Sequence, residues 1–293
     1  MERKILLGID FNNVLFSSYY GSPLVNSKGM NINAIKGFFF KIKLLKETFN
    51  PDYIVLSNDI SRSRTFRRKL YKPYKAQRKV HNDDVINQMR YAMNISALLG
   101  YPIINNELYE ADDILGMISQ YTHENDIDMI IVSSDKDLYQ LINDTTYIYS
   151  PRNKELIDVK WLYDKYHLTP DQWIELKMLQ GDRSDNIPGI PGIGEVTALK
   201  LMQQFNSIES IYNHLGYIKP NIRDLLKKGE SILPLTRELV TIVKDYTKID
   251  FKPQMIESNE RYEQEIYSII EELEIYSLFN VMNYSLFIDK PKQ

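Results

Sequence analysis

Acidic residues gather at five separate places in the sequence, and each group stands at the end of an expected helix or strand. The nine acids are Asp10, Asp59, Glu110, Asp112, Asp113, Asp135, Asp137, Asp182 and Asp185. Singly, each has an ordinary explanation, because an acid in the first turn of a helix complements the helix dipole and an Asp often caps a helix or a turn. Together, they would repel one another unless cations lay between them.

Cations held by this chain would be bound mainly through oxygen, because the sequence contains no cysteine. Clustered hard oxygen ligands select Mg²⁺ or Mn²⁺. Two such ions about 4 Å apart can activate a water molecule and stabilise the leaving oxygen when a phosphodiester is cut. The acids therefore predict metal-assisted phosphodiester hydrolysis.

A run of nine cations without a single acid lies between residues 61 and 80, although the whole chain has a formal net charge of −3. Phe66, Tyr71 and Tyr74 stand among these cations. Such a run is usually a solvated face or a disordered tail, but aromatic residues between cations also suit stacking on single-stranded bases beside phosphate contacts. The run predicts contact with nucleic acid, with Arg67 as one of the DNA-binding residues.

The glycine-rich segment NIPGIPGIG at residues 186–194 precedes an expected helix. Gly189, Gly192 and Gly194 allow backbone N–H groups to point together at an oxygen anion, and the N-terminus of the next helix adds partial positive charge. Alone, this turn would more often be an ordinary connector. Because it directly follows the acidic segment GDRSDN, it predicts a clamp for duplex DNA beside the metal site.

Strands and helices alternate over the first half of the chain, and these elements must position the acids. Strands are expected at residues 4–10, 52–57, 101–105, 128–133 and 145–149, and helices at 33–49, 83–99, 110–124 and 136–142. This alternation predicts a parallel sheet covered by helices, in which ligands bind beyond the carboxyl ends of the strands. Asp10, Asp59 and Asp135 fall at those ends. Beyond Pro151 the strand pattern fades into short helices separated by Gly and Pro.

Composition limits the class of protein. With 293 residues, of which 43% are hydrophobic, the chain suffices for one large globular domain or two of ordinary size. Residues 1–4 lead into too few apolar residues for the core of a signal peptide, and the most apolar later stretch, residues 35–45, is interrupted by three lysines. We therefore expect a cytoplasmic protein without a membrane segment.

The motifs together resemble those of the 5′ nucleases, a family that comprises the phage flap endonucleases and the 5′-to-3′ exonuclease domain of bacterial DNA polymerase I. The most specific parts are, in order, FRRKLYKPYKAQR, YEADDILG, SSDKDLYQL and GDRSDNIPGIPGIG. The resemblance implies an α/β fold with a parallel-sheet, PIN-like (resolvase-like) nuclease core over residues 1–155, including a basic helical arch at about 60–100. Residues 156–293 would form a helical DNA-binding part with a helix-three-turn-helix at about 172–206.

The resemblance also implies roles for the motif residues. The first metal would be held by Asp10, Asp59, Glu110, Asp112 and Asp113, and the second by Asp135, Asp137, Asp182 and Asp185, directly or through water. Lys75 and Arg78 match a basic pair at the base of the arch that contacts the scissile phosphate, and Tyr74 matches a position suited to stacking on a base. The three hairpin glycines match the helix-three-turn-helix that binds the duplex strand, where the family also holds a K⁺.

One position departs from the pattern of the family. Relatives carry a lysine two residues after the last hairpin glycine, and here that residue is Val196. We expect one phosphate contact to be missing, or to be supplied by Lys200. No polymerase sequence follows, which predicts a stand-alone nuclease of phage or bacterial type.

The function implied is that of a Mg²⁺-dependent 5′-to-3′ exonuclease and flap endonuclease in DNA replication and repair, with Asp10, Asp112, Lys75 and Arg78 as catalytic residues. Its partners would be DNA with a 5′ flap, a 5′ overhang or an RNA-primed 5′ end. Mn²⁺ could replace Mg²⁺, and the protein would be a monomer of the cytoplasm of a bacterial or phage-infected cell, without an organic cofactor.

Two alternatives remain beside this function. A phosphatase of the haloacid dehalogenase type would need a second Asp two residues after Asp10, where Asn12 stands. A non-catalytic DNA-binding protein with a decayed nuclease site would have lost acids, and none of the nine is missing.

Overall fold

The computed structural model describes residues 3–60, 63–78, 81–251 and 263–281. Its centre is a six-stranded sheet in the order β3-β2-β1-β4-β5-β6. The strands are β1 (Ile5–Asp10), β2 (Tyr53–Ser57), β3 (Ile103–Ile104), β4 (Asp128–Val132), β5 (Thr146–Ser150) and β6 (Glu155–Ile157). β1 to β5 pair in parallel, and β6 is antiparallel to β5. The five predicted strands and the predicted fold class are confirmed.

β6 lies beyond Pro151, where the sequence pattern indicates no strand. It follows a turn at residues 151–154 and pairs Ile157 with Ile148 of β5. Three residues are too few to produce a recognisable alternation, so the hydrogen bonds to β5 decide its conformation. The sheet thus extends across residue 155, and the division of the chain at that residue stays a prediction.

The helices of the first half connect these strands. They are α1 (Phe11–Tyr19), α2 (Asn33–Phe49), α3 (Phe66–Leu70), α4 (Asp83–Leu98), α5 (Ala111–Glu124) and the 3₁₀ helix η1 (Lys136–Leu141). The four predicted helices are confirmed, whereas α1 and α3 were not predicted. α1 follows β1 without a loop, because the carboxylate of Asp10 accepts the N–H of Asn13 at 3.1 Å and caps the helix.

The expected arch at about residues 60–100 includes both a helix of the buried core and a segment made mostly of turns. α4 packs against α2 and belongs to the core of the fold. Residues 63–78 contain α3 and a series of turns, and residues 61–62 and 79–80 lie outside the described residues. The arch as a unit stays a prediction.

The second half is helical. Its helices are α6 (Val159–Tyr166), α7 (Pro170–Gln180), α8 (Glu195–Phe205), α9 (Ile208–Asn213), η2 (Leu215–Tyr217), α10 (Pro220–Gly229), η3 (Glu230–Ile232), α11 (Leu233–Val240), η4 (Tyr246–Lys248), α12 (Glu263–Leu273) and α13 (Ser277–Val281). The expected helix-three-turn-helix at 172–206 coincides with α7, the following loop and α8. None of the described helices has the length and apolar character needed to span a membrane.

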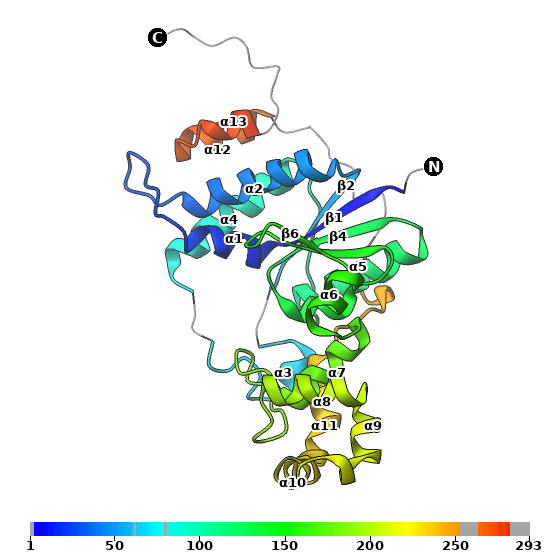
Figure 1. Cartoon of the computed structure of the whole chain (residues 1–293). Coiled ribbons are helices and arrows are strands. Elements are labelled where there is room, and N and C mark those ends of the chain that lie inside the picture. Colours follow the sequence, from blue (N-terminus) through cyan, green and yellow to red (C-terminus); the bar gives the residue numbers. More distant parts are fainter. Residues whose placement is uncertain (1–2, 61–62, 79–80, 252–262, 282–293) are drawn as a thin grey trace.

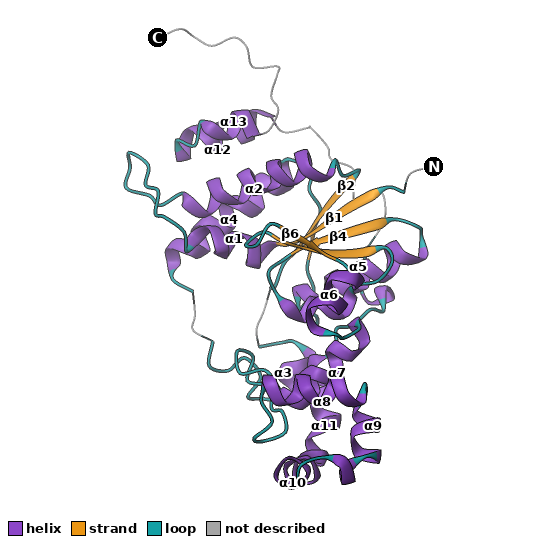
Figure 2. Ribbon diagram, viewed as in Figure 1, coloured by secondary structure: helices purple, strands orange, loops and turns teal. Residues whose placement is uncertain are grey.

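The sheet separates two layers of helices (Figures 1 and 2). α1, α2 and α4 lie on one face with α12 and α13 beyond them, and α5 and α6 lie on the other face. Successive residues of a strand point to opposite faces, so Leu7 and Ile9 of β1 pack in the first layer and Leu6 in the second.

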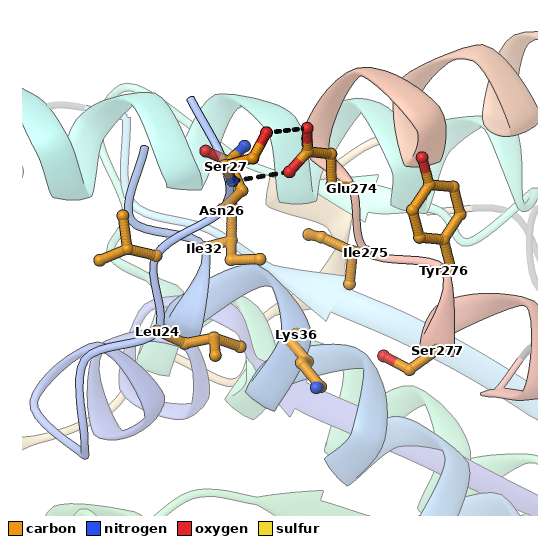
Figure 3. A pocket seen from close by; sticks show the side chains of 10 residues that line it. Leu24, Asn26, Ser27, Ile32, Lys36, Glu274, Ile275, Tyr276 and Ser277 are labelled. Atoms are coloured by element: carbon orange, nitrogen blue, oxygen red, sulfur yellow. Dashed lines mark hydrogen bonds between the residues drawn. The ribbon is translucent and has the colours of Figure 1, made fainter. Parts of the chain in front are cut away.

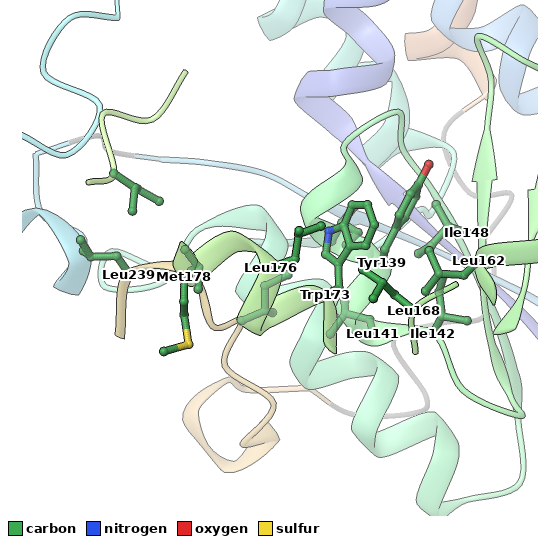
Figure 4. Close-up of a cluster of buried hydrophobic side chains, with 14 of the residues drawn as sticks. Tyr139, Leu141, Ile142, Ile148, Leu162, Leu168, Trp173, Leu176, Met178 and Leu239 are labelled. Carbon is green, nitrogen blue, oxygen red and sulfur yellow. The ribbon is translucent and has the colours of Figure 1, made fainter. Parts of the chain in front are cut away.

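The second layer continues into the helical half of the chain. One buried cluster joins Leu6 and Ile131 of the sheet to Trp173 of α7 and Met202 of α8. Figure 4 shows part of this cluster, in which Tyr139 of η1 lies beside Trp173. Their ring centroids are 5.0 Å apart. The isoleucines of the glycine hairpin belong to the same cluster, so this shared core connects the hairpin to the sheet.

The C-terminal helices are attached to the first half by buried apolar residues and by polar contacts. Glu274 accepts the backbone N–H of Ser27 at 2.7 Å and also the hydroxyl of the same residue (Figure 3). Lys28 donates to the carbonyl of Glu272 at 2.8 Å. A hollow of about 340 Å³ lies beside these contacts, between residues 24–36 and the turn that joins α12 to α13.

Candidate metal centre and DNA interface

Three strand ends bring acids together at one edge of the sheet. Asp10 ends β1 beside Ser57 of β2, and Ile9 pairs with Val132 of β4. Asp59 lies two residues after the end of β2, and Asp135 lies three residues after the end of β4. The shared edge follows from the parallel register, as the sequence predicted.

Hydrogen bonds hold these carboxylates in place. Asp10 accepts the hydroxyl of Ser133 at 2.9 Å. Asp59 accepts the N–H of Ala111, the first residue of α5, at 2.6 Å, which attaches the end of β2 to the helix that carries Asp112. Asp135 caps η1 by accepting the N–H of Asp137 at 2.9 Å.

The electrostatics of the site are those of a buried and crowded cluster of acids. Burial, reinforced by the charges of Asp59 and Asp135, raises the pKa of Asp10 to about 7. Burial and then the charges of Asp135 and Asp10 hold the pKa of Asp112 well above its usual range. Burial and Asp135 likewise raise the pKa of Asp137 to about 6. Each shift favours the neutral acid, so a cation among these groups would be strongly favoured.

The donor atoms of the cluster fit a hydrated divalent cation. Among the residues that the structure describes, no three acidic or histidine side chains converge closely enough to form a ready-made metal cage. Asn12 Oδ1 and Asn58 Oδ1, beside Asp10 and Asp59, are however buried and have no hydrogen-bond partner within the described part of the chain. Hard oxygens that lack partners suit an ion that keeps part of its water shell, as Mg²⁺ does.

Lysine and arginine side chains lie among the acids. Lys75 Nζ lies 2.7 Å from Glu110 Oε1 and 3.5 Å from Asp185 Oδ2, and the Lys75 side chain is almost completely buried. Arg78 also forms an ion pair with Asp185. Lys75 has a positive φ of 51°, a conformation that is uncommon outside glycine and that marks a tightly determined position. The predicted basic pair thus lies beside the acids.

The segment that carries Lys75 is joined to the loop before the hairpin. Gln77 donates to the carbonyls of Arg183 and Ser184, both at 3.1 Å. Asn186 donates to the carbonyl of Pro73 at 2.8 Å. These contacts place the expected arch base against the GDRSDN segment.

Tyr74 differs from the expectation that it stacks on a base. Its ring is only 3% exposed, and its hydroxyl donates to Glu110 Oε2 at 2.6 Å. A buried tyrosine needs a partner for its hydroxyl, and the carboxylate of Glu110 supplies one. In this structure the ring is therefore not available to a nucleobase.

Arg67 and Asp113 also differ from their expected roles. Arg67 is only 3% exposed, and its guanidinium forms two hydrogen bonds to the carboxylate of Asp113, at 2.5 and 2.8 Å. Asp113 is completely buried. In this structure the two side chains satisfy each other, so neither is free for the role that the resemblance implies.

Lys177 is a site residue that the motifs did not indicate. Its Nζ lies 2.5 Å from Asp137 and 2.7 Å from Asp182. Burial alone would lower the pKa of Lys177, but the two carboxylates outweigh it and raise that pKa. The available signal was a single lysine flanked by Leu176, Met178 and Leu179 in α7.

The glycine hairpin packs closely against the end of α7. A side chain at Gly189 would meet the backbone of Gln180 and Gly181 at 2.3 Å. Gly192 has a positive φ of 88° and lies against Leu225 of α10. Only glycine permits both the close approach and the left-handed conformation.

A groove of about 780 Å³ lies beside the hairpin, and Lys136, Arg183, Ile187 and residues 189–195 are among the residues that line it. Gly194 is the N-cap of α8. Val196, which stands where the family pattern has a lysine, lies in the first turn of α8 and is 68% exposed. Lys200 lies one turn later on the same helix and is exposed.

The chain is similar to known 5′-3′ exonucleases over both of its halves. Residues 4–167 match the family described as "5′-3′ exonuclease, N-terminal resolvase-like domain", and residues 168–264 match "5′-3′ exonuclease, C-terminal SAM fold". A 5′-3′ exonuclease of Halalkalibacterium halodurans is 34% identical over 263 residues, which is 85% of this chain and 87% of that protein.

DNA polymerase I of Caldicellulosiruptor bescii is 33% identical over 96% of this chain, and the matched part is 34% of that polymerase. The chain thus spans about a third of the length of the DNA polymerases I that it matches.

Solved structures share the fold at lower identity. A crystal structure of a bacteriophage T5 protein with metal ions has a TM-score of 0.69 at 18% identity and covers 95% of this chain and 100% of that chain. The catalytic core of Rad2 with DNA substrate has a TM-score of 0.61 at 15% identity and covers 96% of this chain and 91% of that chain. From the two matched domains and the relative aligned over most of its length, the chain belongs to the 5′-3′ exonuclease family.

Proposed function

We propose that this chain is a structure-specific 5′ nuclease, which hydrolyses DNA phosphodiesters at 5′ flaps and 5′ ends and uses Mg²⁺ as its cofactor, with Mn²⁺ able to substitute. The observation that carries this proposal is the cluster of Asp10, Asp59, Asp112 and Asp135, in which Asp10 is buried and the other three are partly buried. The four carboxylates repel one another, and burial raises the pKa of Asp10, Asp59 and Asp112, which is what a site for divalent cations requires. Two bound ions would supply an activated water and stabilise the leaving oxygen.

Each side of the cluster would contribute to one ion. We assign Asp10, Asp59, Glu110 and Asp112 to the first, and Asp135, Asp137, Asp182 and Asp185 to the second. Asp113 is left out, because Arg67 and two backbone N–H groups occupy its oxygens. All remaining ligands are hard oxygens, as Mg²⁺ prefers.

The other residues would bind and orient the DNA. Lys75 and Arg78 would exchange their carboxylate partners for the scissile phosphate and stabilise the charge that grows there in the transition state. Gly189 to Gly194 and the N-terminus of α8 would hold a phosphate of the duplex, with a K⁺ bound through backbone carbonyls of the hairpin.

Known relatives support DNA as the partner. The flap endonuclease of bacteriophage T5 has been crystallised in a complex with DNA and metal ions, and Rad2 with DNA substrate. We propose DNA with 5′ flaps, 5′ overhangs or RNA-primed 5′ ends as substrates, in replication and repair. Because several relatives are bacterial DNA polymerases, we further propose that the protein acts in the cytoplasm of a bacterial or phage-infected cell. We propose that it acts there as a monomer.

Product mapping on a duplex with one labelled 5′ flap tests this proposal. We expect cleavage near the base of the flap only when Mg²⁺ or Mn²⁺ is added. Asp112→Asn should lose cleavage by several orders of magnitude and keep duplex binding, because it removes an oxygen anion needed for hydrolysis and no DNA contact. Tight flap binding without cleavage at any Mg²⁺ concentration would instead support the alternative of a non-catalytic DNA-binding protein.

A further inference from the structure

Arg67 is surrounded by acceptors that belong to the protein. In addition to its two bonds to Asp113, its Nε donates to the carbonyl of Leu239 at 2.8 Å, and its Nη2 donates to the carbonyl of Thr241 at 2.7 Å. Its Nη1 also lies 3.4 Å from Glu110 Oε2. Three segments distant in sequence therefore meet at one guanidinium, namely α3, the start of α5 and the end of α11.

Asp113 is equally occupied. Its Oδ2 accepts the N–H of Glu110 at 3.1 Å, which closes a capping box at the start of α5, and its Oδ1 accepts the N–H of Val243 at 3.0 Å. With the two bonds from Arg67, each oxygen of this carboxylate accepts two hydrogen bonds. The pair fixes the backbone at Glu110, the residue that begins the acidic motif.

The two oxygens of Glu110 have different surroundings. Oε2 accepts the hydroxyl of Tyr74 at 2.6 Å and lies beside Arg67. Oε1 is 2.7 Å from the ammonium group of Lys75, which also reaches the carboxylate of Asp185. One oxygen is thus held by buried groups, and the other faces the cation and the acids of the site.

We propose that Arg67 and Asp113 are positioning residues that, together with Tyr74, fix Glu110 so that it offers the single oxygen Oε1 to the metal centre. This inference rests on the proposed function and refines the assignment of its first metal. Residues that orient a ligand in this way typically change metal affinity by about 10- to 100-fold when they are replaced.

The bidentate geometry of Arg67 distinguishes this role from a DNA contact. A lysine keeps the positive charge but lacks the planar fork that binds both oxygens of Asp113. Arg67→Lys should therefore preserve a phosphate contact, if there were one, and should lose the positioning of Glu110.

The experiment compares Arg67→Lys and Tyr74→Phe with wild type, using Lys69→Gln as the matched control for an exposed cation on the same helix. Mn²⁺ affinity is measured by titration without DNA, and flap-DNA affinity is measured in EDTA over a range of salt concentrations. We expect Arg67→Lys to weaken Mn²⁺ binding by about 10- to 100-fold and Tyr74→Phe to weaken it less. Both should leave the metal-free DNA affinity and its salt dependence unchanged. Lys69→Gln should leave Mn²⁺ affinity unchanged.

Contrary outcomes are distinct. Wild-type Mn²⁺ affinity in Arg67→Lys overturns the inference. Arg67→Met, which removes the charge, is also measured in EDTA over the same salt range, and a salt dependence shallower by about one phosphate contact in this variant overturns the inference too. Should either Arg67 variant fail to unfold cooperatively, Tyr74→Phe decides, because it removes one hydroxyl from the same Glu110 oxygen. Wild-type affinity in that variant then counts against the inference. Failure of wild type to cut a flap would contradict only the proposed function, since these measurements require no cleavage.

Discussion

At the scale of single residues, the carboxylates of the site repel one another, and cations reduce this repulsion. Asp10 ends β1 and accepts hydrogen bonds from Ser133 and from the start of α1, and the charges of Asp59 and Asp135 act on it. Lys75 and Lys177 each bridge two carboxylates from different parts of the chain. These ammonium groups occupy the kind of position that a divalent ion would take, because both neutralise more than one anion.

Asp10 leads to a prediction about pH. Its pKa rises from an ordinary 3.8 to about 7 on folding, so between these values the folded protein binds more protons than the unfolded chain. The contribution of Asp10 to stability is therefore fully present below the lower value and is lost as pH rises to about 7. Asp10→Asn cannot ionise, and Asn can still cap α1. In EDTA, the melting temperature of wild type should fall more steeply between pH 4 and 8 than that of the variant.

Saturating Mg²⁺ provides the control for this measurement. The ion should stabilise wild type above pH 7 and have much less effect on Asp10→Asn. If the melting temperatures of the two proteins in EDTA depended on pH in the same way, folding would not raise the pKa of Asp10.

At the scale of elements, the ends of helices and strands determine which groups face the DNA. α8 begins directly after the glycine hairpin, so its first turn lies beside the place proposed for a duplex phosphate. An exposed valine there contributes neither charge nor a hydrogen bond. Lys200 is one turn farther along the same helix, and the first-turn position itself has no cation.

Val196→Lys should therefore strengthen binding of duplex DNA in EDTA. One added phosphate contact should steepen the logarithmic dependence of affinity on salt by about 0.9, without changing the single-turnover cleavage rate at saturating substrate. Val196→Gln serves as the control for the change in size and polarity. An unchanged salt dependence in Val196→Lys would mean that the duplex does not pass the start of α8.

At the scale of the whole molecule, the acids of the two proposed metals come from different halves of the chain. Asp10, Glu110 and Asp112 belong to the sheet and to α5, whereas Asp182 and Asp185 belong to the loop between α7 and the hairpin. The halves share one buried cluster. DNA docked on the hairpin would thus act on the loop-side acids most directly.

Asp182→Asn combined with Asp185→Asn should leave the sheet-side ion bound and weaken the second, since hard cations lose affinity as anionic ligands are removed. Single-turnover flap cleavage should then need a much higher Mg²⁺ concentration and lose its cooperative dependence on it. Added metal should rescue Asp10→Asn to a smaller degree. Identical Mg²⁺ curves for the two variants would leave only one undivided acidic cluster.

The sequence by itself determined the strands of the sheet, the edge at which the acids meet, the hairpin and the family. Apolar runs such as residues 4–10 are buried on both faces and have few other structures available to them. Parallel connection then brings their carboxyl ends, with Asp10, Asp59 and Asp135, to one edge regardless of the details of packing. Short elements escaped this reasoning, because β6 and α3 depend on neighbouring segments rather than on their own pattern.

Only the tertiary structure decided which charges pair. Arg67 stands in a run of exposed-looking cations, and Asp113 in a run of acids 46 residues away, and nothing in either run separates them from their neighbours. Lys177 likewise reaches Asp137, which is distant in sequence. A sequence pattern reports charge and local preference, but an ion pair depends on distance in space and on loss of water. Both are set by the way in which the helical half packs against the sheet.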